Sequence, residues 1–412
     1  MAEVDPGIAE ALDKMAAEDP QRARMAATAM SWVTGGGGAG RITQERIQRF
    51  CWYDLPLKWQ SDVATRQTIV VALAELLDHL GLPRYAEICR SPQTIEVHAA
   101  YAQNPQKGLL AFRKANLESG IYPPDLPEFT WGAAMGPEEA ATLAAVQDYL
   151  ELALVAGDLV PGTRGWKRRQ AKLVRTYLNT PNPRLAGQTP LDVTLTERIQ
   201  RWLGAEQSET RRQILSGLAN RLLHSAHLPE EIKDPYPALS RFLSELKDGE
   251  GPDPDRPDPL VALSKDLRFT RKHSGRIVLT RLGESYLKDP LKHWRRVPQT
   301  LKTSNSFHRL AGELLLATLL KEGAGTLLDI VETISQAAAE AGYREAGTGE
   351  PPGTDSINRA CSETLGPFET LELIERSGES DSVELRLNPI GEATALETLR
   401  QKASGPGVAP WE

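Results

Sequence analysis

Two clusters of basic side chains are the residues of this sequence that are best suited to bind a ligand. The window Leu159–Leu191 holds seven Lys or Arg residues and no acid, and the window Lys265–Lys302 holds eleven with three acids. The formal net charge of the chain is −7, so the remaining residues are strongly acidic. A local positive patch attracts a polyanion even on an acidic protein, because salt screens charges over about 8 Å. The clusters predict nucleic-acid contacts, and solvated faces paired with neighbouring acids are the alternative.

The first cluster has the spacing of an amphipathic helix over residues 165–178. With about 100° of rotation per residue, apolar and basic side chains fall on opposite sides. The apolar side carries Trp166, Leu173, Val174, Tyr177 and Leu178. The other side carries the candidate nucleic-acid-binding residues Arg164, Arg168, Lys172 and Arg175. We expect the apolar side to dock on the protein and the basic side to face water.

The second cluster has the pattern of a β-hairpin followed by a helix. Residues 267–271 read as a strand, residues 272–275 as a turn, and residues 276–280 as the returning strand. The basic residues at and beside the turn would contact phosphates. The candidate nucleic-acid-binding residues of this hairpin are Arg268, Arg271, Lys272, Arg276 and Arg281.

The end of this hairpin carries a short signature that occurs twice. Leu279-Thr280-x-x-Gly283 recurs as Leu387-Asn388-x-x-Gly391. Thr280 and Asn388 are good helix caps. The pattern resembles the closing strand and helix of winged helix-turn-helix DNA-binding proteins of the antibiotic-resistance repressor type, over about residues 208–400. The resemblance implies two tandem winged-helix-like units and double-stranded DNA as the partner, with a recognition helix in the major groove and the hairpin on phosphates.

The second hairpin differs from the first in charge. Its residues include Glu372, Glu375, Glu379, Asp381 and Glu384 against a single Arg376. Such a hairpin does not suit phosphates, and a basic protein partner would fit it better. The alternative function is therefore a protein-interaction adaptor. A second resemblance points the same way: residues 177–191 are similar to the Pro-Asn-x-x-Leu-x-Gly-x-Thr-Pro stretch of the toxin-binding domain of some bacterial antitoxins, although a helix end, a turn and a Thr189 cap also explain them.

No set of residues predicts catalysis. Gly35-x-Gly37-x-x-Gly40 matches the dinucleotide fingerprint formally, but no strand is expected before it, so we predict a flexible linker and no cofactor. His224 and His227 lack zinc-protease spacing, so no metal is predicted. The aromatic cluster Phe50, Trp52, Tyr53 and Trp59 could stack bases, and core packing is the preferred interpretation. We expect a protein that is not an enzyme, with a catalytic site that the sequence does not reveal as the remaining alternative.

The predicted fold is mainly α: an all-helical N-terminal half precedes two winged-helix-like α+β units. Asp5 and Thr43 are expected helix caps, and prolines open helices over residues 83–90, 92–103 and 237–247. The predicted domains are an N-terminal helix and linker (1–41), a helical domain (42–204), a first winged-helix-like domain (205–303), a second one (304–402) and a disordered tail (403–412). An acidic, Pro- and Gly-rich segment over residues 248–259 reads as a mobile loop. The acidic N-terminus and the lack of an apolar run of about 18 residues predict a cytoplasmic protein without membrane contact.

Overall fold

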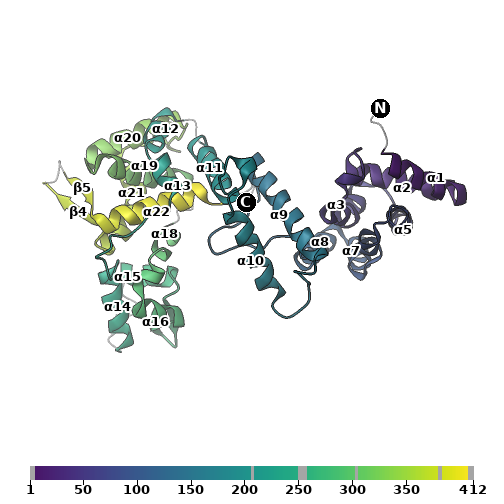
Figure 1. The fold of residues 1–412 in the computed structure, drawn as a ribbon. Coiled ribbons are helices and arrows are strands. Elements are labelled where there is room, and N and C mark those ends of the chain that lie inside the picture. Colours follow the sequence, from purple (N-terminus) through teal and green to yellow (C-terminus); the bar gives the residue numbers. More distant parts are fainter. Residues whose placement is uncertain (1–4, 206–207, 249–257, 302–304, 379–382, 407–412) are drawn as a thin grey trace. The chain divides into compact units, whose positions relative to one another are not determined.

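The computed structural model describes residues 5–205, 208–248, 258–301, 305–378 and 383–406, and its fold is mainly helical (Figure 1). The chain forms two compact units. Unit 1 consists of residues 1–131 and 137–191, and unit 2 consists of residues 132–136 and 192–412. In the described part of the chain every named strand follows residue 269, in two small antiparallel sheets. The prediction of a mainly helical chain with late hairpins is confirmed.

Unit 1 is built from helices that begin at caps or prolines visible in the sequence. Asp5 and Thr43 each accept a hydrogen bond from a backbone N–H of the first turn, so these predicted caps are confirmed, and Asp62 caps the next long helix in the same way. The elements of unit 1 are α1 (Pro6–Glu18), α2 (Pro20–Thr34), η1 (Ala39–Arg41), α3 (Gln44–Arg49), η2 (Phe50–Asp54), α4 (Leu55–Lys58), α5 (Val63–His79), α6 (Pro83–Arg90), α7 (Pro92–Gln103), α8 (Pro105–Glu118), α9 (Pro137–Val155), α10 (Trp166–Asn179) and η3 (Pro183–Leu185).

The Gly-rich segment after α2, predicted as a flexible linker, makes defined turns and contacts the start of α1. Gly35 ends α2 in the left-handed conformation at φ 62°. The Ala39 N–H donates to Asp5 Oδ2 over 2.9 Å, which ties the segment to the start of α1. A Cβ on Gly38 would lie 2.6 Å from Asp5 Oδ2. Gly35 therefore supplies a left-handed turn, and Gly38 allows a close approach to Asp5. Both roles require glycine, whereas amino-acid composition alone suggests a flexible segment.

The aromatic cluster of unit 1 is mostly core, as preferred from the sequence. Phe50 and Trp52 are buried, and the Trp52 indole N–H donates to Thr94 Oγ1 over 2.7 Å. Tyr53 is half-buried and packs on Phe112. These residues lie in η2, a π-helical turn that continues α3. A π-turn inserts a residue into a helix and is frequent near functional sites.

Unit 2 packs its helices around α19, which is buried over most of its length. Within this core the buried Arg211 guanidinium donates to Glu313 Oε2 over 3.1 Å and to the backbone oxygens of Trp202 and Leu203. The helices are α11 (Pro190–Leu203), α12 (Glu209–Ser216), α13 (Ala219–Leu223), α14 (Pro237–Lys247), α15 (Pro259–Asp266), α16 (Arg281–Lys288), α17 (Pro290–His293), α18 (Arg296–Thr300), α19 (Ser306–Glu322), α20 (Leu327–Glu340), α21 (Thr354–Thr370) and α22 (Pro389–Ser404).

Two hairpins lie in unit 2. The first joins β1 (Thr270–His273) and β2 (Arg276–Leu279). The second joins β4 (Ile374–Ser377) and β5 (Glu384–Leu387), and β5 also pairs with β3 (Ala324–Thr326), which gives the order β3-β5-β4. Figure 1 shows β4 and β5 extending from the helices of unit 2. The sequence did not reveal β3, because three small residues carry no alternating pattern.

The first strand of the first hairpin begins later than predicted. The sequence placed it at residues 267–271, whereas β1 begins at Thr270. Arg268 has φ 61° and its N–H donates to Lys265 O, while the Phe269 N–H donates to Ser264 O. This pair of bonds closes the end of α15, so residues 267–269 form a helix cap and not a strand.

The repeated signature forms the same connection between each hairpin and the helix that follows it, and we call this connection the joint. The side chains of Thr280 and Asn388 cap α16 and α22 by accepting from the N–H of Gly283 and Gly391. A Cβ on Gly283 would lie 2.4 Å from Phe269 O, and one on Gly391 would lie 2.0 Å from Leu373 O. The caps predicted at Thr280 and Asn388 are confirmed, and the two glycines allow a close approach of backbone segments.

The two units divide the chain at points other than the predicted domain limits. Residues 5–41 share one apolar core with the helices that follow them, through buried side chains such as Ile8, Met30 and Ile47. Unit 1 ends at Leu191, and most of α11 belongs to unit 2. Both hairpins share a single core in unit 2. Hydrophobic packing between distant segments sets these limits, and linker composition does not show it.

Candidate nucleic-acid interface

The first hairpin presents its basic side chains to solvent. Its register pairs Arg271 with Val278, Lys272 with Ile277 and His273 with Arg276. Because successive side chains alternate between faces, Arg271, His273 and Arg276 share one face, and Lys272 lies on the other. Thr270 and Ile277 are buried on the face that carries Lys272. The outer face therefore carries two arginines and a histidine in one row.

The five candidate residues of the hairpin are all exposed. Arg268 stands in the turn between α15 and β1, and Arg281 is the first residue of α16. The side chains of these five residues make no ion pair and no hydrogen bond with any described residue. Cations without internal partners keep their full capacity to bind an external anion.

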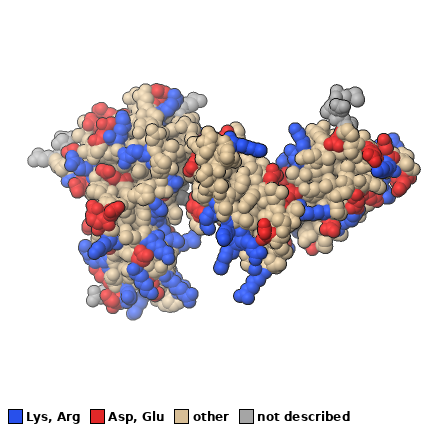
Figure 2. Space-filling model, in the orientation of Figure 1, with Lys and Arg blue, Asp and Glu red and all other residues tan. Residues whose placement is uncertain are grey.

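Lys and Arg gather over the part of unit 2 that α14, α15 and α16 form (Figure 2). Among the described residues, the exposed acids on this part are Glu245, Asp248, Asp266, Glu284 and Asp289, and they are fewer than the exposed Lys and Arg residues. The acidic segment predicted at residues 248–259, which would repel DNA, falls largely outside the described residues.

One member of the row was not predicted from the sequence. His273 was assigned to the turn, whereas it pairs with Arg276 inside the hairpin. The signal that could have found it is the two-residue Ser274-Gly275 turn, because both residues have positive φ and such a turn fixes the register on either side.

The basic stripe of α10 in unit 1 is only partly available. Trp166, Val174 and Leu178 are buried, whereas Leu173 and Tyr177 are half-buried. Arg164, Arg168 and Lys172 are exposed and have no ion pair with a described residue. Arg175 is also exposed, but its guanidinium binds both carboxylate oxygens of Glu128 and the pair raises the pKa of Arg175. Three of the four predicted cations of the stripe are therefore without an ion pair among the described residues.

The second hairpin is less acidic than its sequence suggested. Arg386 lies directly opposite Glu375 in the register, so the two charges are neighbours. Arg376 is ion-paired with Glu369 of α21. Glu372 and Glu375 are exposed and Glu384 is half-buried, whereas Glu379 and Asp381 lie outside the described residues.

The part of the chain that the structure describes offers few residues for catalysis or metal binding. His98 is buried, its Nε2 lies 2.8 Å from Cys51 O, and burial lowers its pKa. No three His, Cys, Asp or Glu side chains of the described residues are placed to hold a metal ion. The described helices include none with the length and apolar character needed to cross a bilayer.

Comparisons of the chain with protein-family models, with curated proteins and with solved structures give no match. The function is therefore inferred from the geometry and charge of the chain itself.

Proposed function

We propose that this chain binds double-stranded DNA through the first hairpin, as a non-enzymatic regulatory protein with two winged-helix-like units. The observation that carries the proposal is that Arg271, Lys272 and Arg276 on β1 and β2 are exposed and that their side chains have no partner among the described residues. The element order supports the second such unit: α19, β3, α20, α21, β4, β5 and α22 follow one another, and β5 pairs with both other strands. The shared joint at Gly283 and Gly391 supports a common architecture for the two hairpins.

The contacts proposed for the hairpin are to the DNA backbone. Arg and Lys at a hairpin neutralise phosphates and release counterions, which gives affinity without sequence preference. The helix before the hairpin, α15, exposes Ala262, Lys265 and Asp266. This set offers few groups that read base edges. We therefore expect binding that depends strongly on salt and weakly on sequence.

The test measures fluorescence anisotropy of a short random-sequence duplex at several salt concentrations. Replacing Arg271, Lys272 and Arg276 together by Ala should weaken binding similarly for all duplexes. The slope of log affinity against log salt should flatten by about 0.9 for each phosphate that the variant no longer neutralises. The fold should remain, because exposed charges at a turn change stability by no more than about 0.5 kcal/mol.

The matched control is the double variant Arg376→Ala with Arg386→Ala, which removes the cations of the second hairpin. It should bind the duplex like the wild type. Unchanged affinity and slope in the triple variant, or an equal decrease in the control, would remove the first hairpin from the proposed DNA-binding surface.

The stripe of α10 is proposed as a second phosphate contact. Changing Arg168 and Lys172 to Glu turns two attractions into two repulsions, so binding should fall steeply while the melting temperature stays nearly the same. A large decrease in stability would show that these cations serve the fold of unit 1.

The adaptor function remains a second candidate because of the second hairpin. Glu372 and Glu375 are exposed, and the neighbouring Arg376 is engaged by Glu369. A surface of this charge fits a basic protein segment better than phosphates. Calorimetry with a Lys-rich peptide tests this candidate: binding by the wild type that Glu372→Gln with Glu375→Gln removes would support it, and no binding would reject it.

A further inference from the structure

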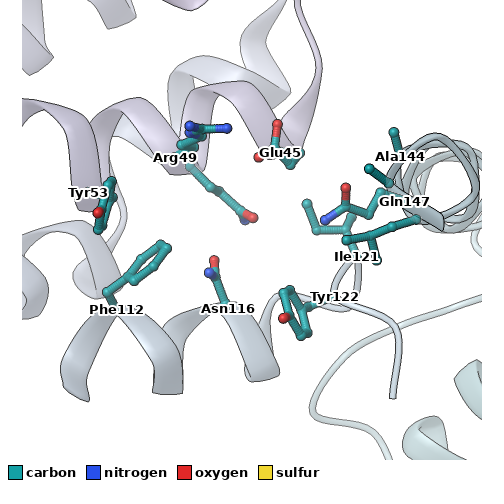
Figure 3. A pocket seen from close by; sticks show the side chains of 12 residues that line it. Glu45, Arg49, Tyr53, Phe112, Asn116, Ile121, Tyr122, Ala144 and Gln147 are labelled. Carbon is teal, nitrogen blue, oxygen red and sulfur yellow. The ribbon is translucent and has the colours of Figure 1, made fainter. Parts of the chain in front are cut away.

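Unit 1 contains a pocket of about 510 Å³ that the proposed DNA contacts do not use. Three helices and one loop form it. α3 and η2 supply Glu45, Arg49 and Tyr53, as Figure 3 shows. α8 supplies Phe112 and Asn116 one turn apart, and the segment after α8 and helix α9 close the other side. A pocket of this volume has the size of a small-molecule site.

The walls of the pocket are aromatic and aliphatic. The rings of Tyr53 and Phe112 lie with their centroids 5.3 Å apart at an interplanar angle of 39°, and Tyr122 lies across the pocket from Tyr53 (Figure 3). Ile121 and Leu143 add aliphatic surface. A flat apolar ring is the shape that such walls bind best, because aromatic faces stack on planar partners.

The polar groups of the pocket have unused hydrogen-bonding capacity. Gln48 is 4% exposed, and its Oε1 accepts no hydrogen bond from any described residue. The side chains of Glu45, Asn116 and Gln147 likewise make no hydrogen bond within the described chain. In Figure 3 the Asn116 amide points into the pocket. A buried acceptor without a donor costs free energy, and a ligand N–H would remove that cost.

The charged groups constrain the ligand further. Burial raises the pKa of Glu45, against the opposing effect of Arg49 and Arg46. The Arg49 guanidinium lies 3.5 Å from Asp54 and is exposed at the side of the pocket. A half-buried carboxylate accepts hydrogen bonds, so Glu45 favours a ligand that donates N–H groups.

We propose that this pocket binds a small planar nitrogen heterocycle that carries N–H donors and ring acceptors along one edge, the class to which free nucleobases belong. The ring would stack against Tyr53, Phe112 and Tyr122. Its N–H groups would donate to the Glu45 carboxylate and, after a small rotation of the buried Gln48 side chain, to Gln48 Oε1. The amides of Asn116 and Gln147 both donate and accept, so they match an edge on which donors and acceptors alternate. A purely apolar ligand would leave these groups unsatisfied.

The experiment is isothermal titration calorimetry of the full chain with adenine, guanine, cytosine and uracil, and with indole as a planar ring that has a single N–H. We expect saturable binding of at least one base to one site per chain, and weaker binding of indole. Gln48→Leu and Asn116→Leu should each lower that affinity about tenfold, the factor that corresponds to one missing hydrogen bond.

A matched control and a stability measurement separate binding from folding. Gln106→Leu, on the exposed start of α8 outside the pocket, should bind like the wild type. The melting temperature of Gln48→Leu should be equal to or above that of the wild type, because the change removes an unsatisfied buried oxygen. If Gln48→Leu does not fold, Glu45→Gln and Asn116→Leu serve for the affinity comparison. No saturable binding of any base, or wild-type affinity in the pocket variants, would overturn the proposal.

Discussion

The two hairpin regions of unit 2 share a backbone joint and differ in charge. In each, a residue with positive φ ends the preceding helix: Arg268 at 61° and Glu372 at 57°. In each, the cap side chain also donates to the carbonyl oxygen of that residue over 2.7 Å, from Thr280 in the first hairpin and Asn388 in the second. The first region surrounds this joint with cations that no described residue pairs. The second surrounds it with acids, with Arg376, which is ion-paired with Glu369, and with Arg386, which lies opposite Glu375.

The joint and the surface of a hairpin are thus specified by different residues. The joint needs a glycine and a capping side chain, because two backbone segments meet there at short distance. The exposed positions are free to vary, since charges in water contribute little to folding. A fold-level likeness therefore does not transfer a function from one hairpin to the other.

The largest expected effect comes from the glycine of the joint. Gly391→Ala places a Cβ 2.0 Å from Leu373 O, and Gly283→Ala places one 2.4 Å from Phe269 O. Each should lower the free energy of unfolding by about 3 kcal/mol or more, because the added Cβ forces the rigid backbone to move. The decrease should be larger for Gly391→Ala, since its Cβ would lie nearer to the backbone oxygen. Urea denaturation followed by circular dichroism measures this. Gly366→Ala, in open space within α21, should be neutral or stabilising by up to about 1 kcal/mol.

The next effect is on DNA affinity. Reversing Arg271 and Arg276 to Glu should lower duplex affinity about a hundredfold at low salt, because two phosphate contacts become repulsions. Anisotropy titration measures the change. The reciprocal variant Glu372→Lys with Glu375→Lys should raise affinity, because the second hairpin has the same joint. Absence of any gain there would show that charge alone does not distinguish the two hairpins.

A smaller effect on stability concerns the hydrogen bonds that join the start of α12 to the end of α20, a helix of the second hairpin region. Glu340 accepts from the Thr210 N–H, the Thr210 hydroxyl and the Ser208 hydroxyl, and these bonds lower its pKa from 4.5 to about 2. A carboxyl with a lowered folded-state pKa stabilises the fold above its unfolded pKa and loses that contribution as the pH falls towards the folded value. The stability of the wild type should therefore decline between about pH 4.5 and pH 2.

The Glu340→Gln variant should show less of this decline, measured by urea denaturation at about pH 6 and pH 3. Glu332→Gln, an exposed change on the same helix without a side-chain partner among the described residues, should decline like the wild type. An equal decline in Glu340→Gln would mean that other carboxyls set the acid sensitivity.

The smallest effect is at the turn of the first hairpin. Ser274 and Gly275 both have positive φ, at 49° and 80°, which is the turn that Asn-Gly favours. Ser274→Asn should raise stability by up to about 0.5 kcal/mol in thermal denaturation. Ser377→Asn, in β4 where φ is not positive, should give no gain. A gain of equal size at both positions would contradict the turn assignment.

Much of the secondary structure could be predicted because its signals are local. The bounds of α6, α7 and α14 agree with prediction, since prolines open these helices and an apolar period follows. The caps at Thr280 and Asn388 are also side-chain effects over three residues. The prediction missed features whose signal is not local: β3 exists only through its pairing with β5, and the hydrogen bond from the Ala39 N–H to Asp5 joins residues 34 positions apart.

The candidate sites divide in the same way. The sequence by itself determined where the basic residues cluster and that a hairpin carries the second cluster, because charge and alternation are read directly along the chain. Only the tertiary structure decided that Glu128 binds Arg175 and that Gln48 and Asn116 line one pocket. Each of these pairs joins residues that the fold brings together, and the free energy of such contacts comes from packing that no local pattern contains.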